Sequence, residues 1–243
     1  MKNWISSLPI ALAIIAGSLI AAGAYRYKFR SVETISVTGL AEKDFSSDQI
    51  VWTGNFSRSG YELKAVYALL KSDEAQIRGY LNSKGIQDTN MVFSSLDIQK
   101  LYEPKYDKDG KTVGSIFNGY TLTGKVTVDS RDIDRIERLS REITDLLQKG
   151  IEFTSSTPRY YYSKLNDIKI DLLAKAAMDG RTRAETIAKN SGASLGDIRK
   201  ATMGIFQITG KNSNEEYSYG GAFNTSSREK TASITLRVDY GVR

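Results

Sequence analysis

Two side chains that many enzymes use for nucleophilic or metal chemistry, cysteine and histidine, are missing from this sequence. Its 243 residues contain no cysteine and no histidine. This excludes disulfides, cysteine nucleophiles, Ser-His and Cys-His triads and the common zinc ligand sets. Acid–base chemistry would rest on carboxylates, lysine or tyrosine alone. We therefore expect a protein that is not an enzyme.

Two short acidic segments come closest to a catalytic or metal-binding pattern. Glu42 and Asp44 form an acid pair, but no base, nucleophile or metal partner is recognisable nearby. Asp107–Gly110 has the composition of a calcium loop, yet its glycine stands at the fourth position instead of the sixth, and no glutamate follows at the twelfth. We interpret the first segment as a solvated loop and the second as a turn. The sequence thus predicts no catalytic residue, no metal site and no cofactor.

Tyrosines at two places are the best candidates for contact with a partner or ligand. The candidate contact residues are Tyr160, Tyr161, Tyr162, Tyr217 and Tyr219. The first three follow Arg159, and such a mixture of aromatic and basic side chains can stack single-stranded bases. Tyrosine is also enriched at subunit interfaces, and we favour packing against a helix or a neighbouring subunit. The modest net charge of +6 is best explained by a solvated basic surface, so no nucleic acid is expected as a partner.

An uncharged N-terminal run of residues indicates that the chain is targeted to a membrane, either as an anchor or as a signal segment. Ile5–Ala24 spans 20 residues without a charge, enough at about 1.5 Å per residue to cross a hydrocarbon core of about 30 Å. With Lys2 before it and small residues at its end, the run also fits a cleavable signal peptide. We favour an uncleaved transmembrane anchor, because the run is long and is followed by tyrosines and cations such as Arg26. Residues 1–30 are therefore predicted to be an anchor or signal segment, and residues 31–243 one folded domain.

Alternating apolar residues predict the strands of this domain. Ile35 and Val37 indicate a short strand that ends in a turn at Gly39, and a charged loop follows. From residue 48 a second strand places Ile50, Trp52 and Phe56 on one face, and we expect the last two in the core. Further strands are predicted over residues 91–101, 115–128, 151–160, 198–208 and 231–242. In the second of these, the polar residues that alternate over Thr121–Thr127 predict one face in contact with water. The last strand, over residues 231–242, has no proline and would be poorly protected at a sheet edge.

The segments between these strands show the periodicity of helices. Apolar residues at three- and four-residue spacings predict helices over residues 63–81 and 131–149 and from about Lys164 to Asn190. Gly85 is the expected C′ residue after the first helix. Ser130 is the expected N-cap of the middle helix, and Ile187 is expected to face inward. Residues 48–129 and 151–241 each follow the order strand, helix, strand, strand. We therefore expect an α+β domain, an antiparallel sheet with helices packed on one face and two such halves, preceded by the transmembrane helix.

The first two strands also resemble a known family. The series Val37, Gly39-Leu40-Ala41-Glu42, Ser47-Asp48, Ile50 and Trp52 is similar to the opening of the SIMPL domain, a bacterial domain of poorly defined function. Later pieces continue the resemblance: Gly119-Tyr120, Asp132-Ile133, Ala174-Lys175-Ala176-Ala177, Asp179, Arg183-Ala184, Ala188, Gly192 and Leu195-Gly196. Their order and spacing make the likeness specific over about residue 35 to the C-terminus. Gly54 and the Ser-rich tip at 224–227 have no counterpart in it.

The resemblance implies a place and a role but no chemistry. Members are periplasmic or membrane-anchored α+β domains, some of which assemble into large rings, and they are linked to envelope integrity and stress tolerance. It implies a bacterial inner-membrane protein with a single pass and a periplasmic domain, whereas the three cations after the run slightly favour a cytoplasmic domain. We expect a membrane-anchored homo-oligomer. The alternative is a ligand- or polymer-binding module that uses the tyrosine-rich loops and a cleft between helices.

Overall fold

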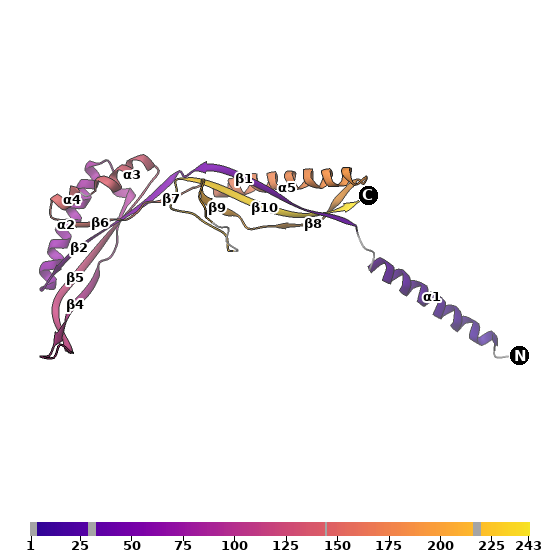
Figure 1. The fold of residues 1–243 in the computed structure, drawn as a ribbon, viewed down its shortest axis with the longest axis horizontal. Helices are drawn as coiled ribbons and strands as arrows, with labels where there is room; N and C mark the ends of the chain where they lie inside the picture. Colours follow the sequence, from indigo (N-terminus) through magenta and orange to yellow (C-terminus); the bar gives the residue numbers. More distant parts are fainter. Residues whose placement is uncertain (1–3, 29–32, 144, 216–219) are drawn as a thin grey trace. The chain divides into compact units, whose positions relative to one another are not determined.

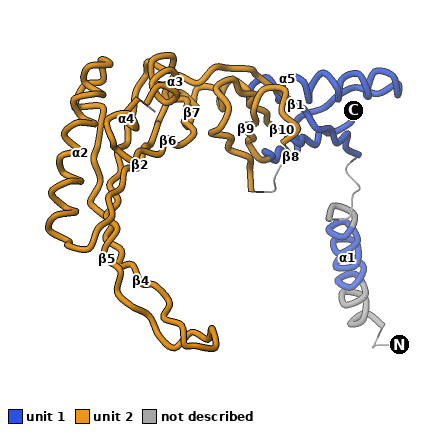
Figure 2. The backbone as a smooth tube through the Cα atoms, turned by 60° about the vertical axis from the view of Figure 1, so that its left-hand side comes forward, with its two compact units in different colours: residues 1–40, 174–204, 235–243 blue, residues 41–173, 205–234 orange. Residues whose placement is uncertain are grey.

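The computed structural model describes residues 4–28, 33–143, 145–215 and 220–243. Two compact units are present, and the chain passes between them more than once (Figure 2). We call residues 41–173 with 205–234 the central unit. Residues 1–40, 174–204 and 235–243 form the terminal unit. The fold is α+β with antiparallel sheets, as the sequence predicts.

The central unit is built on an antiparallel sheet with two long middle strands. Its strands are β2 (Gln49–Gly60), β3 (Met91–Phe93), β4 (Asp97–Tyr106), β5 (Thr112–Ser130), β6 (Glu152–Ser155) and β7 (Arg159–Tyr161). They follow the order β3-β5-β2-β6, with β4 also paired to β5 and β7 also paired to β2. The register runs without interruption from the pair Ile50–Ser130 to the pair Gly60–Tyr120. β2 and β5 are therefore the rigid base on which the rest of this unit is placed.

Helices cover one face of this sheet and bury its apolar side chains (Figure 1). They are α2 (Leu63–Ser83), α3 (Ile133–Glu142) and α4 (Asp145–Gln148), with the 3₁₀ helix η1 (Asp88–Asn90) ahead of β3. Every second residue of β2 faces this core, and Trp52 and Phe56 are 0% and 1% exposed, as predicted. The apolar stripe of α2 includes Leu70 and Ile77, both fully buried. Gly85, with φ +85°, ends α2 in the left-handed conformation that the sequence predicted for it.

Two glycines of the sheet make room for aromatic rings. A Cβ on Gly54 would lie 2.0 Å from the ring of Phe153, and one on Gly124 would lie 2.4 Å from the ring of Phe56. No side chain fits at such distances, so glycine is required for the rings to lie flat on the neighbouring strand. Gly54 thus has a packing role within the core.

The remaining elements form a second antiparallel sheet and its helix. They are β1 (Thr34–Ser46), β8 (Leu195–Met203), β9 (Gln207–Gly210), β10 (Glu229–Val242) and α5 (Leu165–Asn190). The order is β1-β10-β8, with β9 paired to the first residues of β10. In the terminal unit, Gly39 lies within β1 and does not end it. A Cβ there would lie 2.0 Å from the carbonyl oxygen of Ala176 in α5, so this glycine allows the helix to approach. The predicted turn at Gly39 and the charged loop after it are wrong.

Other sequence predictions are corrected by the strand order. One sheet was expected, but two are present, and β6 and β7 from the second half pair with β2 from the first. The predicted strands over 91–101, 151–160 and 198–208 are each divided into two, so neither half has the predicted order strand, helix, strand, strand, and the halves do not form separate sheets. β10 lies between β1 and β8, so it is not an exposed edge strand. The N-cap of α3 is Asp132, whose carboxylate accepts the amide hydrogen of Arg135, and not Ser130. Ile187 is 46% exposed and does not face inward.

The N-terminal segment is a separate helix, α1 (Trp4–Lys28). Within the described residues, the structure has no helix that combines the length and the apolar character needed to span a membrane. The predicted transmembrane span is thus not confirmed by the described part of the chain. Residues 1–3 and 29–30 of the predicted anchor lie outside it.

Candidate functional site

The adjacent tyrosines at β7 point into different surroundings. Tyr160 lies beside the core, and its hydroxyl donates a hydrogen bond to Glu137 Oε1 at 2.9 Å. Burial, together with this bond to a carboxylate, raises the pKa of Tyr160 to about 12. Tyr162 packs on Phe45 with ring centroids 4.9 Å apart. Both rings therefore have internal packing roles.

Tyr161 lines a hollow on the surface of the central unit. Tyr217 and Tyr219, the other two predicted contact residues, lie outside the described residues. Within the described residues, the hollow combines Tyr161 with several residues that the sequence did not single out, and contact of the five tyrosines with a partner or ligand stays a prediction.

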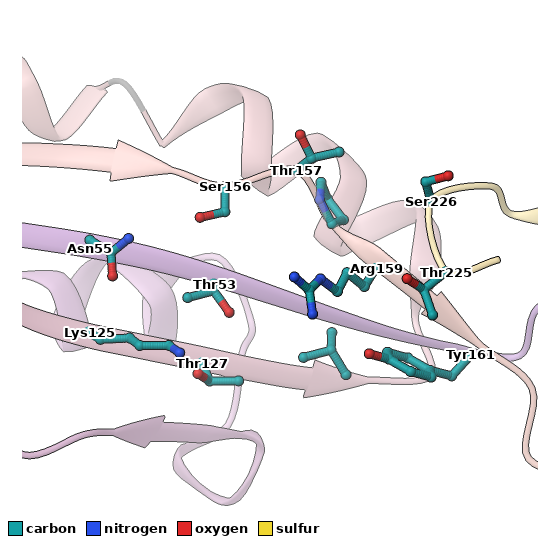
Figure 3. Close-up of a pocket in the computed structure, with 12 residues that line it drawn as sticks. Thr53, Asn55, Lys125, Thr127, Ser156, Thr157, Arg159, Tyr161, Thr225 and Ser226 are labelled. Atoms are coloured by element: carbon teal, nitrogen blue, oxygen red, sulfur yellow. The ribbon is translucent and has the colours of Figure 1, made fainter. Parts of the chain in front are cut away.

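This hollow, which we call the sheet groove, lies on the face of β2 and β5 turned away from the core (Figure 3). It encloses about 630 Å³. Its floor comes from the alternate residues of the two strands: Val51, Thr53, Asn55, Lys125 and Thr127. Because successive side chains of a strand point to opposite faces, the alternation that buries Trp52 and Val126 places these polar groups together. The floor is thus rigid and is rich in hydrogen-bonding groups.

A bulge between β6 and β7 forms one wall of the sheet groove. Ser155 pairs with Gly54, and Arg159 pairs with Val51. Between these two pairs, three residues (156–158) lie opposite two residues of β2 (52 and 53). Such a bulge redirects side chains out of the regular alternation. The wall is held by main-chain bonds, since the Ser156 amide donates to the Thr53 carbonyl at 3.0 Å. The groove therefore has a defined shape on this side.

The Ser-rich tip contributes Thr225 and Ser226 to the same groove. The amide of Tyr160 donates to the carbonyl of Thr225 at 2.8 Å, which fixes the tip against β7. Behind the tip, the buried Lys230 Nζ donates to the carbonyl oxygen of Asn224 at 2.5 Å. Burial lowers the pKa of Lys230 to about 8. The tip that has no counterpart in the family resemblance is thus an ordered part of the site.

The charges of the sheet groove are of one sign. Its lining holds two cations, Lys125 and Arg159, and no carboxylate. Within the described residues, neither side chain has a hydrogen bond or an ion pair. Asp129, the acid opposite Val51, already accepts two bonds from Gln49 Nε2, at 2.7 and 2.9 Å. The side chains of Arg159 and Lys125 extend toward Thr53 and Thr127, over the floor (Figure 3).

The acidic segments that the sequence offered for chemistry have structural roles. Asp44 accepts a bond from Thr231 Oγ1 at 2.7 Å and one from Lys211, which lower its pKa. It lies on β1, so the pair with Glu42 is in a strand and not in the predicted loop. Asp107 Oδ1 accepts the amide hydrogens of Asp109 and Lys111, which confirms the predicted turn.

A second surface of the central unit is an uncovered two-stranded ribbon. We call residues 97–117, the whole of β4 and the first residues of β5, the hairpin ribbon. All ten residues of β4 are exposed, although the strand carries Ile98, Leu101, Tyr102 and Tyr106. On β5, Val113 and Ile116 are 57% and 55% exposed. Among the described strands, β4 pairs only with β5, so its other edge is open.

Two antiparallel sheets, a helix-covered core and an uncovered ribbon define an α+β protein whose sequence contains neither cysteine nor histidine. Comparison of the sequence with protein families identifies it further. Residues 35–240 match the model of the family described as SIMPL, protein of unknown function (DUF541), and the chain belongs to this family. The family resemblance predicted from the sequence is thereby confirmed. A search of curated proteins finds no match.

Proposed function

We propose that the protein is a non-enzymatic, membrane-anchored component of the bacterial cell envelope that assembles with copies of itself through the hairpin ribbon. The observation that carries this proposal is the exposure of apolar residues along the whole of β4. Exposed apolar side chains that gather on one element can form a contact site. An open strand edge is a template for pairing with another chain.

The charge pattern of the ribbon favours a second copy as the partner. Residues 97–111 carry four carboxylates and four lysines, interspersed along the strand and its turn. Such a segment is neutral overall and complementary to itself when two copies lie antiparallel. A symmetric dimer contact requires a surface of this kind, because the same patch meets itself. An anionic membrane or a nucleic acid would instead select a net positive ribbon.

The anchor proposal is supported by the sequence. The run Ile5–Ala24 has no charge and is followed by aromatic and basic residues. The expected location is the bacterial inner membrane, with a single pass and the folded units in the periplasm, where they would support envelope integrity or stress tolerance. If residues 1–30 stay attached, intact-mass analysis of the protein from washed membranes gives the full chain. A mature N-terminus at Tyr25 would contradict the anchor.

The alternative function, a ligand- or polymer-binding module built from tyrosine-rich loops, has less support. Tyr160 and Tyr162 are occupied by contacts within the central unit. Tyr161 is the described tyrosine of this group that lines a groove, and that groove lies on a sheet face, not between helices.

The mass of the full chain in a neutral detergent tests the assembly. Light scattering at micromolar concentration should give a homo-oligomer for the unmodified chain and a smaller species for Val113→Asp with Ile116→Asp. The matched control is Leu69→Asp, an equally exposed apolar residue on α2, 54% exposed, that should leave the mass unchanged. A monomeric unmodified chain, or an equal loss of mass in the control, would contradict the proposal.

A further inference from the structure

We infer that the sheet groove is a binding site for a phosphate group, presented by a phosphate monoester or by the free ion. The inference concerns the central unit alone, goes beyond self-assembly and does not depend on it. It starts from the two cations in the groove lining, for which the described residues provide no counter-charge.

The lining of the sheet groove carries positive charge without a counter-charge among its own residues. Lys125 on β5 and Arg159 on β7 extend over one floor, and the lining residues include no carboxylate (Figure 3). Asp129, which pairs with Val51 in the register, already accepts two bonds from Gln49. Asp48, near the end of β2, accepts the amide and hydroxyl of Ser163 at 2.7 and 2.5 Å. Two like charges that share a hollow repel one another, and a bound anion removes this repulsion.

The lining of the sheet groove also offers several hydrogen-bond donors. A guanidinium offers a planar fork of donors that matches two oxygens of one phosphate, while an ammonium adds a compact charge. The hydroxyls of Thr53 and Thr127 lie on the floor between them, and that of Tyr161 points into the hollow (Figure 3). These groups can supply donors to the remaining oxygens of a tetrahedral anion. The lining therefore suits a multiply charged oxyanion with several acceptors.

The backbone that carries the lining residues is held in place by strand pairing before any ligand binds. Thr53, Thr127 and Lys125 lie on the two middle strands, whose opposite face is the core. Arg159 lies directly after the bulge and is paired to Val51. The tip that carries Thr225 is fixed by its bond to Tyr160. A site on rigid strands loses little conformational freedom on binding.

Isothermal titration calorimetry of the full chain in a phosphate-free neutral detergent tests the inference. The probes are inorganic phosphate and glycerol 1-phosphate. We expect saturable binding of at least one probe that weakens as sodium chloride is added, because salt screens the exposed cations. Tighter binding of glycerol 1-phosphate would assign the site to an ester, such as a lipid headgroup or a sugar phosphate. Equal or tighter binding of the inorganic ion would assign it to free phosphate.

Substitutions locate the binding. Arg159→Ala and Lys125→Ala should each weaken the affinity about tenfold or more, because each removes charge-assisted hydrogen bonds to the anion. Arg159→Lys keeps the charge but loses the fork, so its affinity should lie between those of the unmodified chain and Arg159→Ala. The control is Arg138→Ala, which removes an exposed cation of α3 outside the groove lining and should bind as the unmodified chain does.

Two results would overturn the inference. One is the absence of binding for both probes at millimolar concentration. The other is binding that survives the double substitution of Lys125 and Arg159, since the anion would then lie elsewhere. Circular dichroism of each variant shows whether it is folded, and Lys125→Gln provides a second variant if the alanine form is not.

Discussion

The two ends of β5 lie in different environments, one buried under helices and one exposed in the hairpin ribbon. The buried end stabilises the fold, whereas the exposed end is available for contact with a partner. Toward the C-terminal end of the strand, Leu122, Val126 and Val128 are fully buried under the helices. Toward its N-terminal end, in the hairpin ribbon, Val113 and Ile116 are more than half exposed. Both ends are paired to a neighbouring strand, and the pairing with β4 in the ribbon contains register shifts after Leu101 and Lys105.

The cause of the difference is cover by helices. β2 and the C-terminal part of β5 share one core with α2, α3 and α4, whereas the ribbon residues have no part in that core. Burial of apolar surface stabilises folding, so the ribbon contributes little to the stability of the single chain. Apolar residues that do not stabilise the single chain are available to stabilise an assembly.

The largest expected effect is in the buried half. Trp52 is fully buried opposite Val128, and its indole nitrogen donates to Ser155 Oγ at 3.0 Å. Trp52→Ala should lower the free energy of unfolding by about 3–5 kcal/mol, because it leaves a cavity and removes the hydrogen bond from the indole to Ser155. Urea unfolding followed by circular dichroism measures this change. A loss under about 1 kcal/mol would show that this face is not the core.

A pair of glycine substitutions should have effects of opposite sign. Gly54→Ala places a methyl group against the ring of Phe153 and should destabilise the chain by about 1–3 kcal/mol. Gly79→Ala, on the exposed side of α2 with nothing within 4 Å, should stabilise it by about 0.5–1 kcal/mol. The same unfolding experiment compares the two. Equal effects would mean that Phe153 does not lie over Gly54.

The smallest expected effect on stability is in the ribbon. Val113→Asp with Ile116→Asp changes two exposed side chains, so the free energy of unfolding of the dissociated chain should change by no more than about 0.5 kcal/mol per site. Unfolding is measured at a dilution where light scattering shows single chains, since assembly would add its own stability. A loss of several kcal/mol would place these residues in the core and remove the contrast.

The sequence was a good guide to the buried half of this comparison. Alternation in residues 50–56 predicted β2 and the burial of Trp52, and the helical spacing predicted α2 and its end at Gly85. Local periodicity reports which residues share a face, and a buried face follows directly from it. The family resemblance added the extent of the domain, residues 35–240.

The same periodicity does not identify which elements meet. Nothing in residues 152–161 shows that they pair with β2, or that β10 lies between β1 and β8. Gly39 was interpreted as a turn because close approach of a helix to a strand leaves no local pattern. The exposure of the hairpin ribbon was not predicted for a similar reason. Apolar and polar residues alternate in the same way in an exposed strand and in a buried one.

The sheet groove was predicted only in part. Tyr161 was a candidate, but Lys125 and Arg159 come together through strand pairing across distant parts of the chain. The available signal was the outward alternation of Thr121–Thr127, which predicted a wet strand face. The Ser-rich tip at 224–227 gave a second signal, since it departs from the family pattern and lies at the groove.

Cross-linking through the hairpin ribbon tests the central claim most directly. Because the chain has no cysteine, Ser115→Cys introduces a single thiol on the exposed part of β5, and Ser72→Cys places one on exposed α2 as a control. We expect mild oxidation of the full chain to link two copies through residue 115, not through residue 72, and the link to be lost when Val113 and Ile116 are replaced by Asp. An assembled chain that forms no link at residue 115, or links equally well at residue 72, would contradict the ribbon as the subunit contact.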